Sequence, residues 1–212
     1  MPNEKTIAAD LLSIGAVFLR PEQPFTWASG IKSPIYCDNR LTLSYPEVRN
    51  HVEEGLAGIV KEYYPSVQML MGTSTAGIAH AALTASILGL PMGYVRGEAK
   101  THGRTNRIEG KMDPGTKVVV IEDLISTGGS AVEVVDALRE AGAEVLGIAS
   151  IFTYGMKKGL ERIAAAHTVN RSLCNLDVLV EVAAEKGYVD VSAKSRILAF
   201  RDNPSDESWI GK

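Results

Sequence analysis

Cysteine is scarce in this chain, and its scarcity excludes two common kinds of site. The 212 residues contain two cysteines, Cys37 and Cys174, and four histidines. Neither cysteine belongs to a CxxC pair or to a Cys/His spacing typical of zinc. Two thiols are also too few for a disulfide framework. The sequence therefore predicts that both thiols are free, with no disulfide or metal role, in a reducing compartment.

Long hydrophobic runs and a basic surplus are also absent. No stretch approaches the length of about 18 apolar residues that a membrane-spanning helix needs. The formal net charge is -3, whereas nucleic-acid-binding domains usually carry excess positive charge. Glu4, Lys5 and Asp10 interrupt the first residues, which match neither a signal peptide nor a transit peptide. We therefore expect a cytoplasmic protein without membrane or nucleic-acid partners.

Two familiar phosphate-binding motifs are missing as well. The chain has no Gly-Lys-Ser/Thr of a Walker A loop and no GxGxxG fingerprint. It has no internal repeats and no low-complexity tracts. What remains is ordinary: 45% hydrophobic and 22% charged residues, as in globular proteins. A chain of this length fits one domain.

Strand-like and helix-like segments alternate through the middle of the chain. Residues 117–121 are apolar on both faces, which is typical of a buried strand in a parallel sheet. Ser44 and Glu47 have the spacing of a capping box that opens a helix. The predicted strands cover residues 67–71, 92–95, 117–121 and 145–152, and the predicted helices cover about 7–14, 44–64, 78–88, 130–141, 177–185 and 192–200. This alternation predicts an α/β fold with a central, mostly parallel sheet flanked by helices.

The clearest functional signal follows the predicted central strand. Residues 118–130 run Val-Val-Val-Ile-Glu-Asp-Leu-Ile-Ser-Thr-Gly-Gly-Ser, an apolar run, two carboxylates and a turn of small residues. In open parallel sheets, ligands bind where strands end and helices begin. Free N–H groups at residues 126–130 and the helix dipole can hold a phosphate. Glu122 and Asp123 can accept hydrogen bonds from ribose hydroxyls, so the segment predicts a ribose 5-phosphate site rather than an ordinary helix start.

Two further segments carry polar residues in suggestive places. The loop Gly72-Thr73-Ser74-Thr75-Ala76-Gly77 follows another predicted strand and could be a second phosphate loop or a plain turn. About twenty residues between Val95 and Lys117 lack apolar periodicity, and a loop of that length is functional or disordered. Its cationic residues are Arg96, Lys100, His102, Arg104 and Arg107. From the residues alone, Lys100 and His102 could equally be solvated surface groups.

Three segments together carry a family resemblance. Residues 122–130 resemble the phosphoribosyl pyrophosphate (PRPP) signature of type I phosphoribosyltransferases. Residues 25–38, Phe-Thr-Trp-Ala-Ser-Gly-Ile-Lys-Ser-Pro-Ile-Tyr-Cys-Asp, resemble the substrate segment of the orotate-specific members. Residues 94–103, Tyr-Val-Arg-Gly-Glu-Ala-Lys-Thr-His-Gly, resemble their mobile catalytic loop. The resemblance covers almost the whole chain and implies one phosphoribosyltransferase domain, residues 1–212, with an N-terminal hood over about 1–43 and the α/β core with C-terminal helices over about 44–212.

The resemblance implies a reaction, a metal and a partner. It implies transfer of the 5-phosphoribosyl group from PRPP to orotate, which forms orotidine 5'-monophosphate and pyrophosphate in de novo pyrimidine (UMP) biosynthesis. Mg2+ would arrive with the substrate, without protein ligands of its own. A homodimer would let the mobile loop of one subunit reach the site of its neighbour.

Roles of individual residues carry over in the same way. The implied catalytic residues are Arg96, Lys100 and His102, on the loop that closes over pyrophosphate. The implied PRPP-binding residues are Arg96, Lys100, His102, Glu122, Asp123, Leu124, Ile125, Ser126, Thr127, Gly128, Gly129 and Ser130. Ser126 and Tyr36 would contact orotate, Tyr36 by stacking on the flat base.

Several positions depart from the pattern of some family members. Ala28 and Ala76 stand where some have lysine, and Gly97 stands where some have a second loop lysine. Tyr154 and Gly155 follow Phe152 where some have an arginine for the orotate carboxylate. Lys32 is a candidate substitute cation. The departures leave the contacts to the base open.

Two alternatives compete with orotate transfer. Another phosphoribosyltransferase would act on a purine or on uracil, and residues 25–38 argue against it. A regulator could keep the ribose-phosphate motif as a sensor, but such proteins carry a DNA-binding module. No helix-turn-helix pattern is present here. A sensor would also not need Arg96, Lys100 and His102 on a loop.

Overall fold

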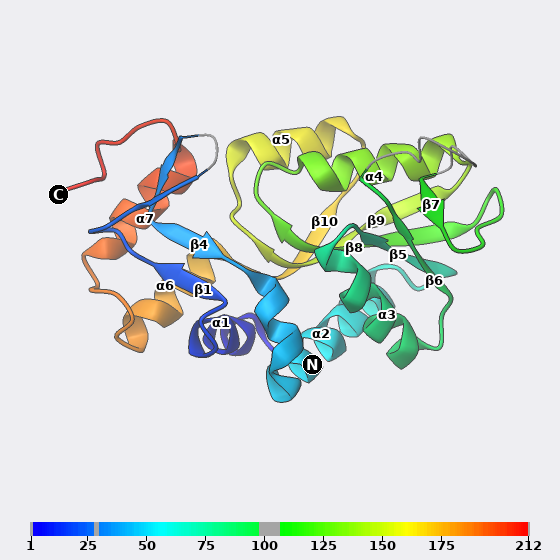
Figure 1. Ribbon diagram of the computed structural model, residues 1–212, viewed down its shortest axis with the longest axis horizontal. Helices are drawn as coiled ribbons and strands as arrows, with labels where there is room; N and C mark the ends of the chain where they lie inside the picture. The colour runs from blue at the N-terminus through cyan, green and yellow to red at the C-terminus, as the bar shows by residue number, and fades with distance from the viewer. Residues whose placement is uncertain (1, 28–29, 98–106, 212) are drawn as a thin grey trace.

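A six-stranded sheet forms the centre of the larger part of the molecule (Figure 1). The structure is a computed structural model, which describes residues 2–27, 30–97 and 107–211. In spatial order the strands are β10 (Asn170–Asn175), β9 (Glu144–Thr153), β8 (Lys117–Ile125), β5 (Met69–Thr73), β6 (Met92–Val95) and β7 (Ile108–Glu109). All neighbours are parallel except β6 and β7. The predicted mostly parallel sheet is therefore confirmed.

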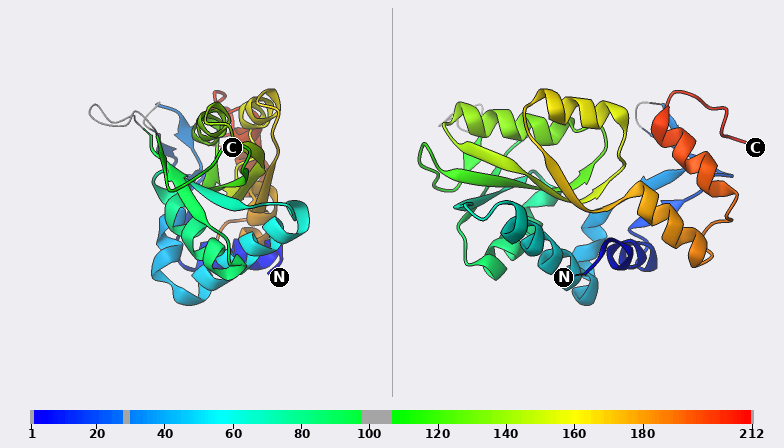
Figure 2. Two further views of the ribbon diagram at one scale, coloured as in Figure 1. Left: turned by 90° about the vertical axis from the view of Figure 1, so that its right-hand side faces the viewer. Right: turned by 180° about the vertical axis from the view of Figure 1, so that it is seen from behind.

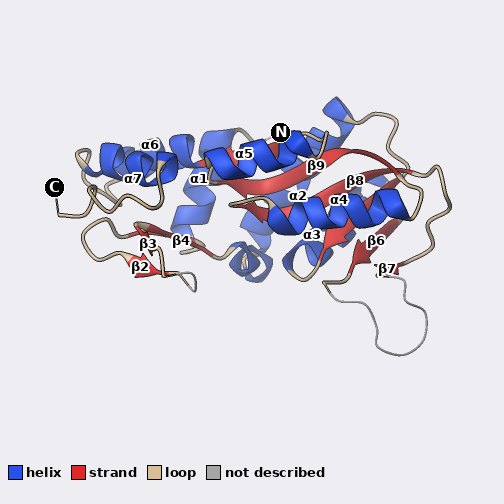
Figure 3. Cartoon of the chain, turned by 90° about the horizontal axis from the view of Figure 1, so that it is seen from above, coloured by secondary structure: helices blue, strands red, loops and turns tan. Residues whose placement is uncertain are grey.

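Helices cover both faces of this sheet, and Figure 3 shows the layers from above. Figure 1 shows α4 (Gly129–Glu140) and α5 (Lys157–Ala165) on one face, with α2 (Pro46–Tyr63) and α3 (Ala76–Leu88) on the other. Side chains of β8 alternate between two apolar clusters: Val118 and Val120 join one, and Val119 and Ile121 join the other. All four are fully buried. Burial on both faces explains why this strand is a continuous apolar run.

A smaller part of the molecule lies beyond the carboxyl ends of the central strands. It contains α1 (Glu4–Ser13), β1 (Val17–Leu19) paired antiparallel with β4 (Ile35–Cys37), β2 (Phe25–Thr26) paired with β3 (Lys32–Ser33), and the 3-10 helix η1 (Asn39–Ser44). The helices α6 (Leu176–Glu185) and α7 (Ala193–Asp202) lie beside these elements, as Figure 2 shows from behind. Trp27 contacts Tyr154 and Phe200, with ring centroids 6.0 and 5.7 Å away. Both ends of the chain thus build this part.

The start of α2 differs from the expectation. Ser44 ends the 3-10 helix η1, and Tyr45 is the N-cap of α2 without a side-chain cap bond. The predicted capping box of Ser44 and Glu47 is therefore wrong. Pro46 gives the physical reason: a proline keeps the residue before it out of the helical region, so Tyr45 is extended, with ψ of 94°, and the helix begins at Pro46 itself.

Strand β8 is longer than expected, and three elements of the α/β core carried no prediction. It continues past residue 121 to Ile125, because Leu124 and Ile125 still pair with Phe152 and Thr153 of β9. The elements without a prediction are α5, β7 and β10. Strand β10 is a polar edge strand, so it lacks the apolar run that marked the central strands. Helix α5 has nine residues with a glycine inside, which weakens its helical signal.

Candidate functional site

The predicted strand, turn and helix succeed one another at the carboxyl edge of the sheet. Glu122 and Asp123 lie within β8, and residues 126–128 connect it to α4. Gly128 is the N-cap of α4 and has a left-handed backbone, with φ of 69°. Glycine adopts this conformation without the steric cost of a Cβ. No side chain caps α4, so its first N–H groups are available to an anion.

Glu122 is buried and bonded inside the protein, and its exposed fraction is 4%. Its Oε1 accepts hydrogen bonds from Thr73 Oγ1 at 2.7 Å and from the Asp123 N–H at 2.9 Å. Its Oε2 accepts one from Ser130 Oγ at 3.2 Å. Burial, followed by the neighbouring Asp123 carboxyl, raises the pKa of Glu122 to about 8. Glu122 therefore links the end of β5 to the start of α4, while Asp123 is only half-buried.

The raised pKa of Glu122 predicts a pH dependence of stability. A carboxyl that titrates near 4.5 when unfolded and at about 8 when folded is protonated only in the native state between these values. The native state then binds more protons, so the free energy of unfolding should fall as pH rises from about 4.5 to about 8. Glu122→Gln, a neutral side chain of the same shape, should lack this component. Urea unfolding at a series of pH values measures it.

Glu54→Gln is the matched control, because Glu54 is exposed on α2. Its stability profile should follow that of the unmodified protein. An unchanged pH slope in Glu122→Gln would show that Glu122 is ionised in the native state across this range.

A second strand-to-helix loop lies directly beside the turn, because β5 pairs with β8. Strand β5 ends at Thr73, and α3 begins at Ala76. Ser74 Oγ donates to the Val95 carbonyl at 2.6 Å, which ties this loop to β6. A Cβ on Gly77 would collide with the Ile121 carbonyl oxygen, so glycine allows α3 to approach β8. The two loops that the sequence singled out therefore share one edge of the sheet.

Arg96 lies at the end of β6, beside β7. Its N–H donates to the Arg107 carbonyl at 2.9 Å, and Arg107 Nε donates to the Arg96 carbonyl at 3.0 Å. Arg96 Nη1 lies 3.5 Å from Glu109 Oε1. Lys100, His102 and Arg104 lie outside the described residues, as does Ala28. The structure thus places only the two ends of the predicted catalytic loop.

Tyr36 lies on β4 with 42% of its surface exposed. Its ring centroid is 5.6 Å from that of Phe25, and the planes are tilted by 40°. Asn39, just beyond β4, donates from Nδ2 to the Asp123 carbonyl at 2.7 Å. This bond fixes the strand of Tyr36 to the end of β8. Lys32 Nζ donates to Thr26 Oγ1 at 2.7 Å within the β2–β3 pair.

Tyr154 explains one departure from the family pattern. Its exposed fraction is 3%, and its ring packs against Trp27 and Phe152. Burial raises the pKa of its hydroxyl well above the usual value. The side chain at this position therefore belongs to the aromatic core between the two parts of the molecule.

Sequence reasoning missed Asn39, Thr73 and Arg162, which all bond the predicted site through long-range contacts. Asn39 and Thr73 bind Asp123 and Glu122, and Arg162 Nη1 donates to the Thr127 carbonyl at 3.2 Å. Only Thr73 had a sequence signal, since it belongs to the second loop. Asn39 and Arg162 lie far from the turn in the sequence, so nothing in the sequence indicated that they contact it.

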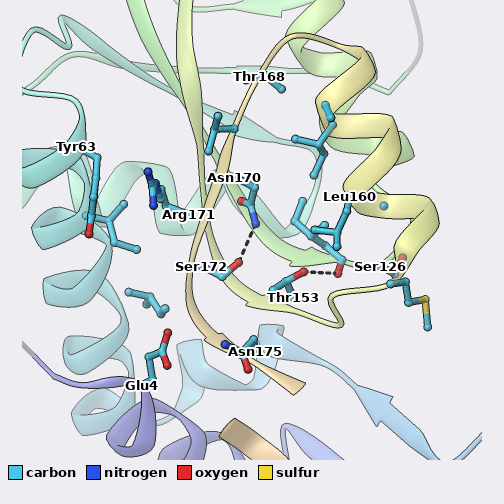
Figure 4. A pocket seen from close by; sticks show the side chains of 18 of the residues that line it. Glu4, Tyr63, Ser126, Thr153, Leu160, Thr168, Asn170, Arg171, Ser172 and Asn175 are labelled. Atoms are coloured by element: carbon cyan, nitrogen blue, oxygen red, sulfur yellow. Dashed lines mark hydrogen bonds between the residues drawn. The ribbon is translucent and has the colours of Figure 1, made fainter. Parts of the chain in front are cut away.

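A pocket of about 680 Å³ lies next to the turn, between α5 and the edge strand β10 (Figure 4). Ile125 and Ser126 line one end, and Thr153 Oγ1 donates to the Ile125 carbonyl there at 3.3 Å. The acidic pair does not line this pocket.

None of the helices in the described ranges has both the length and the apolar character of a membrane-spanning segment.

Comparison with known proteins places the chain in a family. A family model described as phosphoribosyl transferase domain matches residues 43–178. Orotate phosphoribosyltransferases of Bacillus cereus (strain G9842) and Bacillus anthracis (strain CDC 684 / NRRL 3495) are 58% identical over 207 residues, which cover 98% of this chain and 99% of each relative.

Solved structures show the same fold. Orotate phosphoribosyltransferase from Aeropyrum pernix superposes with a TM-score of 0.73 at 28% identity, over 86% of this chain and 99% of that one. UMP synthase of Leishmania donovani gives a TM-score of 0.81 at 25% identity, over 94% of this chain and 42% of that longer chain. The relatives are 58% identical over nearly the full length of the chain, and the fold and the order of the motifs agree with theirs. The chain therefore belongs to the orotate phosphoribosyltransferase family.

Proposed function

We propose that this chain transfers the 5-phosphoribosyl group from PRPP to orotate, forming orotidine 5'-monophosphate and pyrophosphate in de novo UMP biosynthesis. The observation that carries the proposal is the β8–turn–α4 edge, where free helix N–H groups lie next to an acidic pair. The Bacillus relatives support orotate as the base, because they are named orotate phosphoribosyltransferases and are 58% identical over nearly the whole chain.

The ribose 5-phosphate is proposed to bind along residues 122–130. The N–H groups and hydroxyls of residues 126–130 would hold the phosphate. Asp123 is the better ligand of the acidic pair for ribose hydroxyls, because Glu122 already accepts bonds from Thr73 and Ser130. Leu124 and Ile125 belong to β8 and would contribute backbone.

The departing pyrophosphate is proposed to meet Arg96, Lys100 and His102. Negative charge grows on its oxygens as the bond to ribose C1 breaks, and preorganised cations stabilise that charge. Mg2+ carried on the phosphates would supply further positive charge as a Lewis acid. Among the described residues, no cluster of three or more His, Cys, Asp or Glu side chains could hold a metal ion. The half-buried Asp123 is the one carboxylate at the turn that could face such a substrate-bound ion.

The base is proposed to lie between Tyr36 and the turn. Tyr36 is exposed and fixed to the core through Asn39, so its ring can stack on a flat anion. Ser126 would contact orotate from the turn. We further expect a cytoplasmic homodimer in which the loop of residues 94–103 acts on the neighbouring site.

One assay tests the function. Purified protein is mixed with orotate, PRPP and Mg2+, and the absorbance of orotate is followed. We expect a loss of absorbance that requires all three additions. No loss with orotate, but turnover of uracil or a purine, would assign another base. No turnover with any base would instead favour a sensor of ribose phosphates.

A further inference from the structure

Helix α5 covers the back of the turn at contact distance. A Cβ on Gly159 would come within 2.5 Å of the Ser126 carbonyl oxygen. A Cβ on Gly128 would lie 3.3 Å from Ile163 Cγ1 of the same helix. Figure 4 shows α5 directly beside Ser126. The turn therefore has a second support that neither β8 nor α4 provides.

Arg162 brings a positive charge to this contact. Its Nη1 donates to the Thr127 carbonyl at 3.2 Å and would lie 2.8 Å from a Cβ on Gly129, the first residue of α4. The side chain is half-buried. Within the described part of the chain, no carboxylate forms an ion pair with Arg162. The Arg162 guanidinium therefore lies next to the N-terminus of α4 with a backbone carbonyl as its partner.

The bond to Thr127 also fixes the orientation of one peptide unit. In a planar trans peptide, the carbonyl and the following N–H point in opposite directions. Arg162 draws the Thr127 carbonyl toward α5, so the N–H of Gly128 points away from α5. That N–H is one of the donors that an anion at the start of α4 would use.

We propose that Arg162 is a positioning residue for the phosphate end of PRPP: it orients the Thr127–Gly128 peptide and adds positive charge behind the turn. The inference rests on the proposed function, because it assumes that residues 126–130 hold the 5-phosphate. It extends that function to a helix that none of the sequence motifs includes. Arg162 raises affinity for the phosphate group and leaves the base site unaffected.

Arg139 provides a matched control at the other end of the same helix pair. Its Nη1 donates to the Ala166 carbonyl at 2.6 Å, and its Nη2 donates to the His167 carbonyl at 3.1 Å. Arg139 thus fastens α4 to the end of α5 with the same type of bond, away from the turn. A loss that reflects only helix packing should appear equally in Arg139→Met and Arg162→Met.

The experiment measures two quantities in Arg162→Met, Arg162→Lys and Arg139→Met. Steady-state kinetics give KM for PRPP and for orotate, and calorimetric titration gives the Kd of inorganic phosphate. In Arg162→Met we expect both the KM for PRPP and the Kd of phosphate to rise about tenfold, the effect of one charged hydrogen bond. KM for orotate and kcat should change little. Arg162→Lys should recover part of the affinity, since it keeps the charge.

The outcomes separate this inference from the proposed function. An unchanged KM for PRPP in Arg162→Met, or an equal rise in Arg139→Met, overturns the role of Arg162. If Arg162→Met does not fold, Arg162→Gln takes its place, because it removes the charge and keeps a polar side chain: a phosphate Kd equal to that of the unmodified protein at low and high salt overturns the role. If the unmodified protein converts no orotate, the proposed function fails, and phosphate titration still tests Arg162.

Discussion

Replacing Lys100 with alanine should lower kcat about 100- to 1,000-fold, the usual cost of removing one preorganised group that stabilises transition-state charge. The family resemblance assigns Lys100 to the departing pyrophosphate, whose negative charge is largest in the transition state. The side chain therefore contributes less to binding of the ground state, and binding of orotate should weaken far less than turnover. Stopped assays give kcat, and equilibrium titration gives the Kd of orotate.

Lys111→Ala is the control for this variant. Lys111 lies on the chain between β7 and β8, and its side chain is 87% exposed, beside Asp113. Its removal lowers the net charge by the same amount and should leave kcat unchanged. Equal losses of kcat and orotate affinity in Lys100→Ala would count against a role at the pyrophosphate.

The turn and its flanking elements could be predicted because their signals are local. The apolar run of β8 follows from burial on both faces, and the small residues at 126–130 follow from the needs of a phosphate loop. The contacts that hold the turn could not be predicted. Thr73 and Arg162 lie 49 and 35 residues from their partners Glu122 and Thr127, and only the folded chain brings them together.

The acidic pair shows the limit of reasoning from residue type. From the sequence alone, Glu122 and Asp123 are equally good candidate ligands for the ribose hydroxyls. In the structure, Glu122 is buried among Thr73 and Ser130, and Asp123 is half-buried at the surface of the edge. Which of two adjacent carboxylates faces inward depends on the pleat of β8, and the strand was expected to end before them.

Position 154 illustrates the same limit for a departure from a pattern. In the sequence, Tyr154 stands near the place where some family members have an arginine. In the structure, it completes an aromatic cluster with Trp27 and Phe152. The substitution therefore has a packing role, which becomes visible only when residues from both ends of the chain are placed together.

The largest effect on stability is expected at a buried polar group between α2 and α3. Glu53 Oε1 lies 2.7 Å from His80 Nδ1, and Glu53 Oε2 accepts a hydrogen bond from Thr84 Oγ1 at 2.8 Å. All three side chains are buried. Glu53→Leu should lower the free energy of unfolding by about 3–5 kcal/mol, because it leaves His80 and Thr84 without their partner. Glu54→Leu, on the exposed side of α2, should change it by less than about 0.5 kcal/mol.

A second replacement in the same cluster tests this explanation. His80 Nε2 has no hydrogen-bond partner among the described residues, so Nδ1 supplies its one bond, the contact with Glu53. In Glu53→Leu/His80→Leu no imidazole remains to be satisfied, and Thr84 can donate to the carbonyl one turn earlier. The double variant should therefore be more stable than Glu53→Leu alone, which urea unfolding can measure. A double variant that is less stable by the sum of both single losses would mean that His80 and Glu53 stabilise the helices independently. Since α3 begins at Ala76, within the loop of residues 72–77, KM for PRPP in the same variants would also show whether the packing of α2 on α3 holds that loop beside the phosphate turn.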